Sequence, residues 1–467
     1  MRSRGLGCWW FSILAAGLIV ALAPSTNWAQ TSDGSSSSDD SDQTAAGVVI
    51  DAQGVLHTKG YADPGGQLMR ERINSARATL DPKLMAFSKL RKVSLNRLEQ
   101  VILDHQGVLT DEMRYMAGLL RVRYVFYYPD SKDIVLAGPA EGWVADPSGR
   151  IVGINSRRPI VQLQDMVVAL RAFPYAGDAP TTIGCSIDPT QEGLAALQRF
   201  NRGVRLNGPP SNDEIRTIAE GVRTSLGNQV ITVQGVSPKS HFAQVMVEAD
   251  YRMKLIGIGI ETPPVRMISY VAKAKPSESN GLRRWYFVPD YQCVRESEDQ
   301  LAMELVGDGV KLVGEDEAVL SGGQRRAAAG HGSKASQAFV NSFTKKYPEL
   351  AERSPVYAEL RNLIDLAIAA AFIREQGYCG KAGWKMEFFG SEKAFPVETY
   401  DLPKTVESAV NVIARAGAVS FPVGGGVTIQ ATEALEPNRV LGDEKGKVSK
   451  LHAELKPNLP KGQWWWD

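Results

Sequence analysis

The stretch SPVYAELRNLIDLAIAAAFIREQG, Ser354 to Gly377, predicts a long helix that lies in the interior of the protein. Ser354 and Pro355 suit the N-cap and the first position of a helix, and Gly377 suits its C-terminal end. Apolar residues recur between them at helical spacing, at Leu360, Leu363, Ile364, Ala367 and Ala371. Such an apolar surface must be covered by a core. We therefore expect this helix to be the most buried one in the chain.

The whole chain has the composition of an ordinary globular protein. It has 467 residues, of which 43% are hydrophobic and 22% charged, and this length predicts two to three small domains. Helical and strand-like stretches both occur, so we expect an α+β or mixed α/β fold. The 53 basic and 52 acidic residues leave a formal charge of +1. Nucleic acid is not an expected partner, because a protein that neutralises many phosphates shows a basic excess.

The first residues resemble an export signal. Arg2 and Arg4 precede an apolar run, Trp9 to Ala23, which is short for a membrane span. We expect a signal peptide at residues 1–29, cut after Ala29 or alternatively after Ser25. An uncleaved anchor is the competing interpretation. The expected location is the periplasm or the cell envelope, with no transmembrane domain after cleavage.

A polar segment follows the signal. Residues 30–46 are rich in Ser and Asp and have no large apolar side chain. Such a segment cannot bury enough surface to offset the entropy of ordering, so we expect a disordered spacer.

Three cysteines remain after the expected cleavage, namely Cys185, Cys293 and Cys379. They can form at most one intramolecular disulfide, and the pairing cannot be deduced from sequence. Their wide separation excludes a CxxC metal or redox site. Buried, unreactive thiols are the favoured interpretation.

An N-terminal α+β domain is expected over residues 47–207. Asp and Gly residues between apolar stretches predict two hairpins, Val48–Leu56 and Trp143–Val152. Ser94 and Thr110 are expected to cap two short helices. Two strands and a further helix complete the domain, at Val122–Tyr128, Asp133–Ala137 and Gln162–Phe173.

A central domain is expected over residues 208–330. Ser211 and Glu214 form a capping box that predicts the start of a helix. A strand, a helix and a second strand are expected next, at Gln229–Val236, Phe242–Met253 and Leu255–Glu261. This order predicts a β-α-β crossover that pairs the two strands in parallel.

Four charges in the helix of that crossover have the spacing of ion pairs. Glu248 and Arg252 are four residues apart, and so are Asp250 and Lys254. A solvated, salt-bridged face is the favoured interpretation, and a polar cleft around Asp250, Tyr251 and Arg252 is the alternative.

The C-terminal third is expected to be a helix-rich α+β region, residues 331–455, followed by an extended Pro- and Trp-rich tail, residues 456–467. Trp384–Phe389 and Val427–Ala431 read as strands, and Gly424 to Gly426 as a turn or loop. The tail ends in Trp464, Trp465 and Trp466, which we interpret as an exposed aromatic cluster and as candidate partner-binding residues. Docking of this cluster onto its own domain is the alternative.

Two sequence phrases carry a family resemblance. HFAQVMVEADYRMKLIGIGIE, His241 to Glu261, and RRWYFVPDY, Arg283 to Tyr291, resemble an uncharacterised family of proteins exported by planctomycete bacteria and known as a domain of unknown function. The similarity is strongest over Val230 to Glu317, with a further part at Phe339 to Ala367. The resemblance implies an exported α+β protein. It carries no activity, so no functional residue is transferred from it.

The sequence contains one weak catalytic candidate. Ser342 and Lys345 have the S-x-x-K spacing that places a nucleophilic serine and an activating lysine on one helical face, but the companion S-D-N and K-T-G motifs are absent. The five histidines are scattered, so neither a metal site nor a cofactor is expected from spacing.

Two functions follow from these observations. The first is an exported binding or structural protein of the periplasm or cell envelope, without a recognisable catalytic site, whose partner is an envelope component or a protein. The alternative is an envelope hydrolase or transpeptidase with an unrecognised site. Enzymatic activity is the less favoured of the two.

Overall fold

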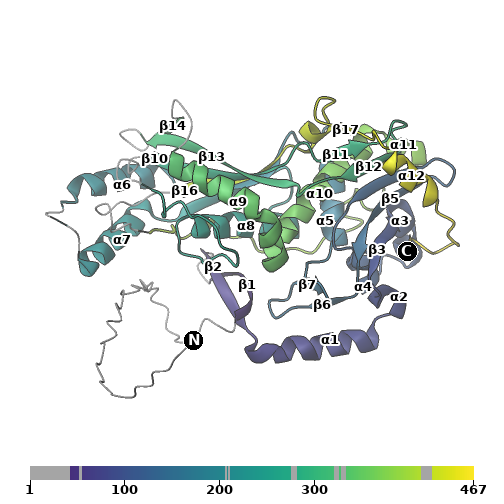
Figure 1. Cartoon of the computed structure of the whole chain (residues 1–467), viewed down its shortest axis with the longest axis horizontal. Coiled ribbons are helices and arrows are strands. Elements are labelled where there is room, and N and C mark those ends of the chain that lie inside the picture. The colour runs from purple at the N-terminus through teal and green to yellow at the C-terminus, as the bar shows by residue number, and fades with distance from the viewer. Residues whose placement is uncertain are drawn as a thin grey trace, which may run out of the picture. The chain divides into compact units, whose positions relative to one another are not determined.

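Two large sheets and the helices that pack on them make up the part of the chain that the structure describes (Figure 1). The structure is a computed structural model, and it describes residues 43–51, 55–205, 208, 211–274, 281–319, 325–327, 333–411 and 423–467. The expected signal peptide, residues 1–29, lies outside these ranges. The predicted spacer runs to residue 46, but strand β1 already begins at Gln43, because its backbone pairs with the next strand whatever its side chains are.

The first sheet has nine strands and is mostly antiparallel. The exceptions are two parallel pairs, β10 with β16 and β15 with β2. In spatial order its strands are β1 (Gln43–Ile50), β2 (Val55–Ala62), β15 (Thr405–Val406), β9 (Gln229–Gln234), β8 (Ile183–Asp188), β16 (Val423–Ile429), β10 (Gly281–Pro289), β13 (Val310–Val319) and β14 (Arg325–Ala327).

The second sheet has seven strands, and a separate two-stranded hairpin accompanies it. In spatial order the seven are β17 (Leu441–Gly442), β11 (Val294–Glu296), β12 (Ala302–Leu305), β4 (Tyr124–Tyr128), β5 (Asp133–Ala140), β3 (Ser88–Ser94) and β18 (Trp465–Trp466). The hairpin is β6 (Trp143–Ala145) with β7 (Ile151–Gly153). Both predicted hairpins, β1–β2 and β6–β7, are confirmed.

The helices range from single turns to the long pair α9 and α10. Those described are α1 (Gln67–Thr79), α2 (Pro82–Met85), α3 (Leu95–Asp104), α4 (Asp111–Arg114), α5 (Leu163–Ala172), α6 (Gln191–Gly203), α7 (Asn212–Leu226), α8 (His241–Gly257), α9 (Lys334–Arg353), α10 (Pro355–Glu375), α11 (Tyr378–Ala382) and α12 (Lys447–Glu454). The capping box of Ser211 and Glu214 is present at the start of α7, as predicted. Together the helices and sheets confirm an α+β fold. Within the described residues, none of the helices has the length and hydropathy to cross a membrane.

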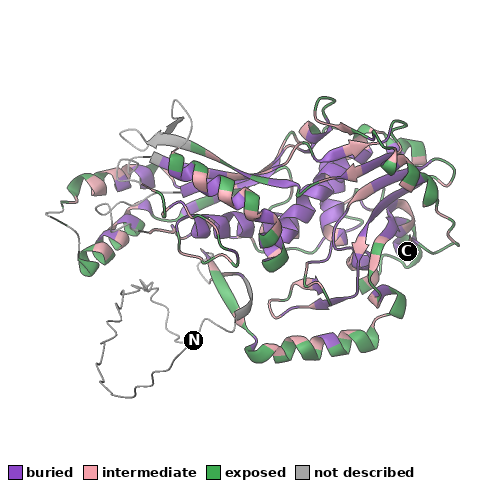
Figure 2. Ribbon diagram, viewed as in Figure 1, coloured by how far each residue is buried: buried purple, intermediate pink, exposed green. Residues whose placement is uncertain are grey.

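Helix α10 is the centre of the core. Every residue from Val356 to Ile373 is buried, which confirms the prediction from its sequence (Figure 2). The helix contacts α5, α8 and α9. Helices thus pack around it, so even its polar positions, such as Glu359 and Asp365, must find partners inside the protein.

The predicted β-α-β crossover is wrong. The stretch Leu255–Glu261 does not form a strand, because α8 continues to Gly257 and ends in a turn at Gly259. The chain therefore runs from β9 through α8 to β10, and β9 is paired with β8 and β15. A short run of apolar residues lacks the alternation of apolar and polar residues that identifies a strand, so its sequence does not distinguish a buried strand from a buried helix. The predicted strand Trp384–Phe389 is wrong as well, since its first half is irregular and its second half forms a turn.

Strand β16 corrects the expectation for the three consecutive glycines. Gly424, Gly425 and Gly426 are not a turn or loop but form the buried middle of a strand between β8 and β10. A Cβ at Gly425 would overlap the backbone of Trp285, and one at Gly426 would overlap the carbonyl oxygen of Cys185. Gly425 also has a φ of 124°. The glycines therefore let two neighbouring strands approach this strand closely.

The expected domain boundaries do not separate independent units. The described residues all belong to one compact unit, residues 39–467. Strand pairs cross each boundary, as β16 pairs with β8, β12 with β4, and β18 with β3. Sequence reasoning missed this because the late strands are short and return to sheets that were begun several hundred residues earlier. The three cysteines are free and buried, which agrees with the favoured interpretation.

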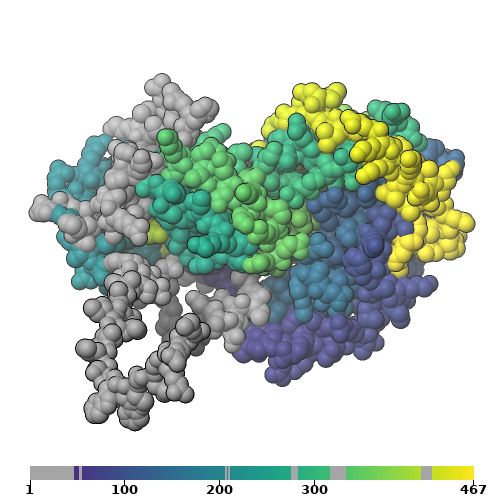
Figure 3. All heavy atoms as spheres, viewed as in Figure 1, coloured from purple at the N-terminus to yellow at the C-terminus, as the bar shows by residue number. Residues whose placement is uncertain are grey.

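The tryptophan tail is docked and not exposed. Trp464 is buried, and Trp465 and Trp466 form β18, which pairs with Val93 and Lys92 of β3. In Figure 3 residues near the end of the chain, in yellow, lie against blue residues of its N-terminal part. The exposed arrangement is therefore wrong, and the other interpretation, docking onto the chain itself, is confirmed, because the backbone of β18 pairs with β3. Partner binding by these residues stays a prediction.

An ion pair between buried Arg91 and the partly exposed Asp467 reinforces the docked tail. The Asp467 carboxylate accepts two hydrogen bonds from the Arg91 guanidinium, both of 2.9 Å. The same guanidinium lies 4.8 Å from the ring of Trp465 and donates to the carbonyl of Ala117. Burial alone would raise the pKa of Asp467, but the contact with Arg91 holds it below its ordinary value. The tail thus supplies the counter-charge of a buried arginine.

We predict that Trp464→Ala lowers the free energy of unfolding by about 3 kcal/mol, because it removes a large buried side chain. Chemical denaturation of the purified protein measures the change. Gln463→Ala is the matched control, since Gln463 is exposed and is expected to change stability by less than about 0.5 kcal/mol. Equal stability of the two variants would show that the tail does not hold the fold together.

We also predict that Gly425→Ala destabilises the protein by about 3 kcal/mol or more, because the new methyl group meets backbone on a neighbouring strand. Gly442→Ala is the control, since a Cβ there meets nothing within 4 Å. Thermal unfolding of both variants measures the difference. A Gly425→Ala protein as stable as the control would contradict the close approach of β16 and β10.

Candidate functional site

A cavity of about 290 Å³ lies where the first turns of α5 and α8 meet the β1–β2 and β6–β7 hairpins. Its walls are partly aromatic and partly polar. The aromatic side chains that line it are Tyr61, Tyr115, Phe395 and Tyr400, and the polar ones include Arg150, Gln164, His241, Gln244 and Glu248. A concave site of this mixed character is the usual form of a small-molecule site.

Two helix N-termini bring polar groups to the cavity. Helix α8 begins at His241, after Ser240 has capped it by accepting a hydrogen bond from the Ala243 amide at 3.2 Å. Helix α5 begins at Leu163, and the lining includes Gln162 and Gln164 on either side of that position. The N-terminal end of a helix carries partial positive charge, which favours a negative group nearby. Asp165, in the first turn of α5, provides that group.

His241 and Asp165 form an ion pair across the two helices. The imidazole Nδ1 lies 2.9 Å from Asp165 Oδ2 and 3.1 Å from Oδ1. Burial disfavours the charged ring, but the Asp165 carboxylate outweighs it and raises the pKa of His241 to about 9. The ring is therefore an imidazolium at neutral pH. Within the described residues no group accepts a hydrogen bond from Nε2, which leaves one donor for a bound molecule.

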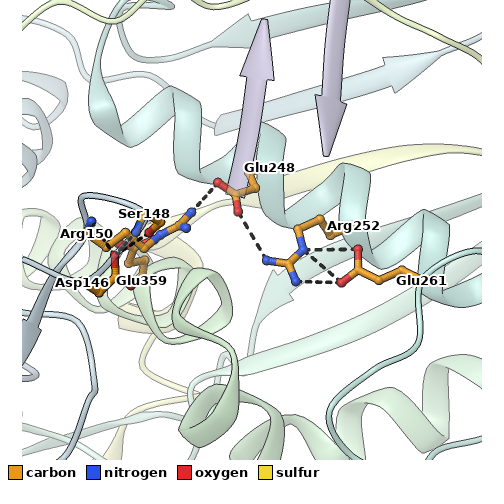
Figure 4. A network of polar contacts seen from close by, with 7 residues as sticks. All are labelled: Asp146, Ser148, Arg150, Glu248, Arg252, Glu261 and Glu359. Atoms are coloured by element: carbon orange, nitrogen blue, oxygen red, sulfur yellow. Dashed lines mark hydrogen bonds and ion pairs between the residues drawn. The ribbon is translucent and has the colours of Figure 1, made fainter. Parts of the chain in front are cut away.

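A chain of ion pairs reaches the cavity at Arg150 and Glu248, which are part of its lining (Figure 4). Arg150 contacts Glu248 of α8 and donates from Nε to Glu359 of α10 at 2.9 Å. Glu248 also accepts from Arg252 at 3.4 Å, and Arg252 donates to Glu261 at 2.8 Å. Asp146 fixes the loop before Arg150, since its carboxylate accepts from the Ser148 and Arg150 amides. The β6–β7 hairpin is thereby tied to two core helices.

These contacts correct the expectation of a solvated helix face. The predicted pairs Glu248–Arg252 and Asp250–Lys254 do exist, but all four side chains are buried. Lys254 donates to Asp250 at 2.7 Å and to the carbonyl of Ile187 at 2.9 Å. Burial raises the pKa of Asp250 to about 6 in spite of this pairing. The i, i+4 spacing reveals the partners but does not show whether water surrounds them.

Two amide side chains of the cavity have unused oxygen atoms. Gln164 Oε1 and Gln244 Oε1 are enclosed and have no hydrogen-bond partner. The Gln164 Nε2 group is used, since it donates to Gln162 Oε1 at 2.6 Å and to Tyr400 Oη at 3.1 Å. An enclosed acceptor without a partner is costly, so each oxygen favours a bound donor. Burial raises the pKa of Tyr400 to about 12, which keeps its hydroxyl neutral.

Two side chains of the lining that could act as a base or a nucleophile, His241 and Ser148, are both engaged by a carboxylate. A charged His241 cannot accept a proton as a general base does. Ser148, the serine in the lining, donates its hydroxyl hydrogen to Asp146 at 2.6 Å. In the ranges that the structure describes, no three His, Cys, Asp or Glu side chains gather as metal ligands would.

The residues predicted as catalytic lie away from this cavity. Ser342 and Lys345 are on α9, and neither lines it. The Ser342 hydroxyl oxygen accepts a hydrogen bond from the Ile268 amide at 2.9 Å, and Lys345 is exposed. Ser342 thus anchors the chain that follows α8. Catalysis by this pair stays a prediction that no contact in the structure favours.

Sequence reasoning did not find the cavity residues. His241 and Asp165 are far apart in the sequence, and no motif links them. The one local signal was Ser240, which marks the start of a helix and hence places His241 in its first turn. The partners of Arg150 come from two different helices, so only the fold brings them together.

The ion pair between His241 and Asp165 predicts a pH-dependent contribution to the free energy of unfolding. The pKa of His241 rises from an unfolded value of 6.5 to about 9, so the pair stabilises the protein fully below about pH 6.5 and progressively less toward pH 9. We expect Asp165→Asn to cost up to about 3 kcal/mol at pH 6 and clearly less at pH 9.5. Urea unfolding at both pH values measures this. A cost that does not change with pH would contradict a charged His241, and His105→Gln, at an exposed histidine, is the control.

The comparisons with known proteins add a family without a function. Residues 185–270 match the model of a family described as a protein of unknown function, DUF1598. The match begins earlier than the expected range, Val230 to Glu317, and overlaps it over residues 230–270. No curated protein and no solved structure matches the chain. The matched segment runs from β8 to beyond α8, so the chain is similar to this family in the part that supplies His241, Gln244 and Glu248 to the cavity.

Proposed function

We propose that the protein is an exported binding protein of the periplasm or cell envelope, and that it holds a small, neutral, hydroxyl-rich molecule of the monosaccharide class in the cavity beside His241. The observation that carries this proposal is a cavity lined by Gln164 and Gln244, whose side-chain oxygens have no hydrogen-bond partner, and by His241, whose Nε2 donor is unused. A hydroxyl group can donate to the first two and accept from the third.

The charges of the site favour a neutral ligand. Arg150 already contacts two carboxylates, and His241 already pairs with Asp165. Arg114, a further cation of the lining, lies 3.3 Å from Glu398. A ligand with a full charge would therefore have to compete with an existing ion pair and lose its own hydration, which is costly in a partly buried site.

The walls and the volume favour a compact ring. Aromatic faces offer apolar contact to the C–H groups of a sugar, while the amides around them bind its hydroxyls. About 290 Å³ lies at the lower end of the range for ligand pockets, so the occupant is smaller than a typical drug.

Export rests on the sequence alone. The basic residues Arg2 and Arg4 before the apolar run support it, and so does the resemblance to an exported family. The alternative of an envelope hydrolase or transpeptidase has less support, because His241 is protonated and Ser342 is bonded to backbone.

We predict that neutral hexoses or N-acetylated hexosamines raise the melting temperature of the wild-type protein, and that isothermal titration calorimetry gives a saturable binding curve for the best of them. Gln244→Leu should weaken that binding about tenfold or more, because it removes an acceptor while keeping the side-chain volume. Gln337→Leu, on the exposed side of α9, should bind as the wild type does.

Three outcomes would contradict the proposal. Binding of uronic acids in preference to neutral sugars would show that the cavity selects an anion. Saturable binding of a sugar that Gln164→Leu and Gln244→Leu leave unchanged would place the sugar elsewhere on the protein. Absence of binding across the whole panel at millimolar concentration would remove the sugar class.

A further inference from the structure

An exposed apolar segment leads to the cavity. Val108 is 67% exposed and Leu103 is 45% exposed, although both side chains are large and apolar. Leu103 lies in the last turn of α3, and Val108 directly precedes Leu109, which lines the cavity. Single exposed apolar side chains are ordinary on a protein surface, but neighbouring ones beside a ligand cavity are typical of a binding surface.

Aromatic side chains connect the same segment to the cavity by a second route. Glu99 lies one helical turn before Leu103, and its carboxylate accepts a hydrogen bond from the Phe388 amide at 3.0 Å. Residues one turn apart lie on one side of a helix, so Leu103 is on the side of α3 that faces Phe388. A Cβ built at Gly107 would lie 3.7 Å from Cζ of Phe388. Phe388 packs edge-on against Phe395, with ring centroids 5.3 Å apart, and Phe395 lines the cavity.

We call Leu103, Val108, Leu109, Phe388 and Phe395 the apolar strip. Leu109 and Phe395 are part of the cavity lining, and Phe388 is partly exposed. Leu103 and Val108 are exposed. The apolar strip therefore begins in the cavity wall and ends on the surface of the protein.

The lining residues that follow the apolar strip along the chain favour an uncharged occupant. Pro396 and Val397 come directly after Phe395 and are apolar. The charged lining residues of the same two segments, Arg114 and Glu398, pair with each other at 3.3 Å. An uncharged chain can therefore lie along the apolar strip without leaving either charge unpaired.

We propose that the ligand of the cavity is amphiphilic, and that a sugar bound beside His241 carries an alkyl chain that lies on the apolar strip. This inference rests on the proposed function, since it places the sugar in the cavity. A volume of about 290 Å³ is at the lower end of the range for ligand pockets, so a long chain attached to the sugar would extend beyond the cavity. Each methylene group that leaves water there contributes up to about fourfold in affinity.

The test compares methyl and hexyl glycosides of glucose, galactose and N-acetylglucosamine, titrated into the full chain by calorimetry below the concentration at which they form micelles. We expect the hexyl glycoside of the preferred sugar to bind at least about tenfold more tightly than its methyl glycoside, because five more methylene groups leave water. The heat capacity change of binding should also be more negative for the hexyl glycoside.

Variants of the apolar strip locate the chain. Val108→Asp and Leu103→Asp should each weaken binding of the hexyl glycoside about fivefold or more, because a carboxylate beside the alkyl chain has to lose water. Both side chains are exposed, so thermal unfolding should show folded proteins. Ile268→Asp is the matched control. Ile268 is 41% exposed and is absent from the cavity lining, so this variant should bind the hexyl glycoside as the wild type does.

The outcomes separate this inference from the proposed function. Equal affinity for methyl and hexyl glycosides would overturn the alkyl chain and leave the sugar site in place. A preference for the hexyl glycoside that survives in both Val108→Asp and Leu103→Asp would place the chain elsewhere and overturn the apolar strip. Hexanol that binds as tightly as the hexyl glycoside would show that the sugar adds nothing, which overturns an amphiphilic ligand. Absence of binding by every glycoside would remove the proposed function together with this inference.

Discussion

Arg150 holds the candidate site together, because it contacts two buried glutamates that belong to different helices. Glu248 lies on α8 and Glu359 on α10, and the loop of the β6–β7 hairpin brings the guanidinium between them. Each carboxylate is buried, so neither could lose this cation without a large desolvation cost. The position of the hairpin is therefore determined by charge as well as by packing. The same contacts fix this part of the cavity wall, since Arg150 and Glu248 also line the cavity.

The same contacts decide what the cavity offers to a ligand. A cleft with a free arginine attracts anions, but here Arg114, Arg150 and His241 of the lining each have a carboxylate beside them. The polar groups that still lack a partner are the amide oxygens of Gln164 and Gln244 and one imidazolium N–H of His241. A site of this kind recognises a pattern of hydroxyl groups more than a net charge.

Local features of the fold could be predicted from the sequence, while features that depend on distant partners could not. Helix α10 and the capping box of α7 follow from spacing within one segment, and both were predicted correctly. The charges of α8 have the spacing of a solvated face, and only contacts with Arg150 and with Gly425 on β16 show that they are buried. The three glycines of β16 resemble a turn until the strands on both sides of it are known.

Contacts between distant parts of the chain also limit what a partial family similarity can mean. The matched segment, residues 185–270, contains Glu248 and Lys254, but Arg150, one of the two cations beside Glu248, and one carbonyl that binds Lys254 lie outside it. Its strands β8 and β9 pair with β16 and β15, which come from the last quarter of the chain. On its own the segment would expose buried charges and two open strand edges. The physical unit that carries the cavity is therefore larger than the matched segment, because Arg150, Asp165 and Glu359 must be present for its polar residues to be paired.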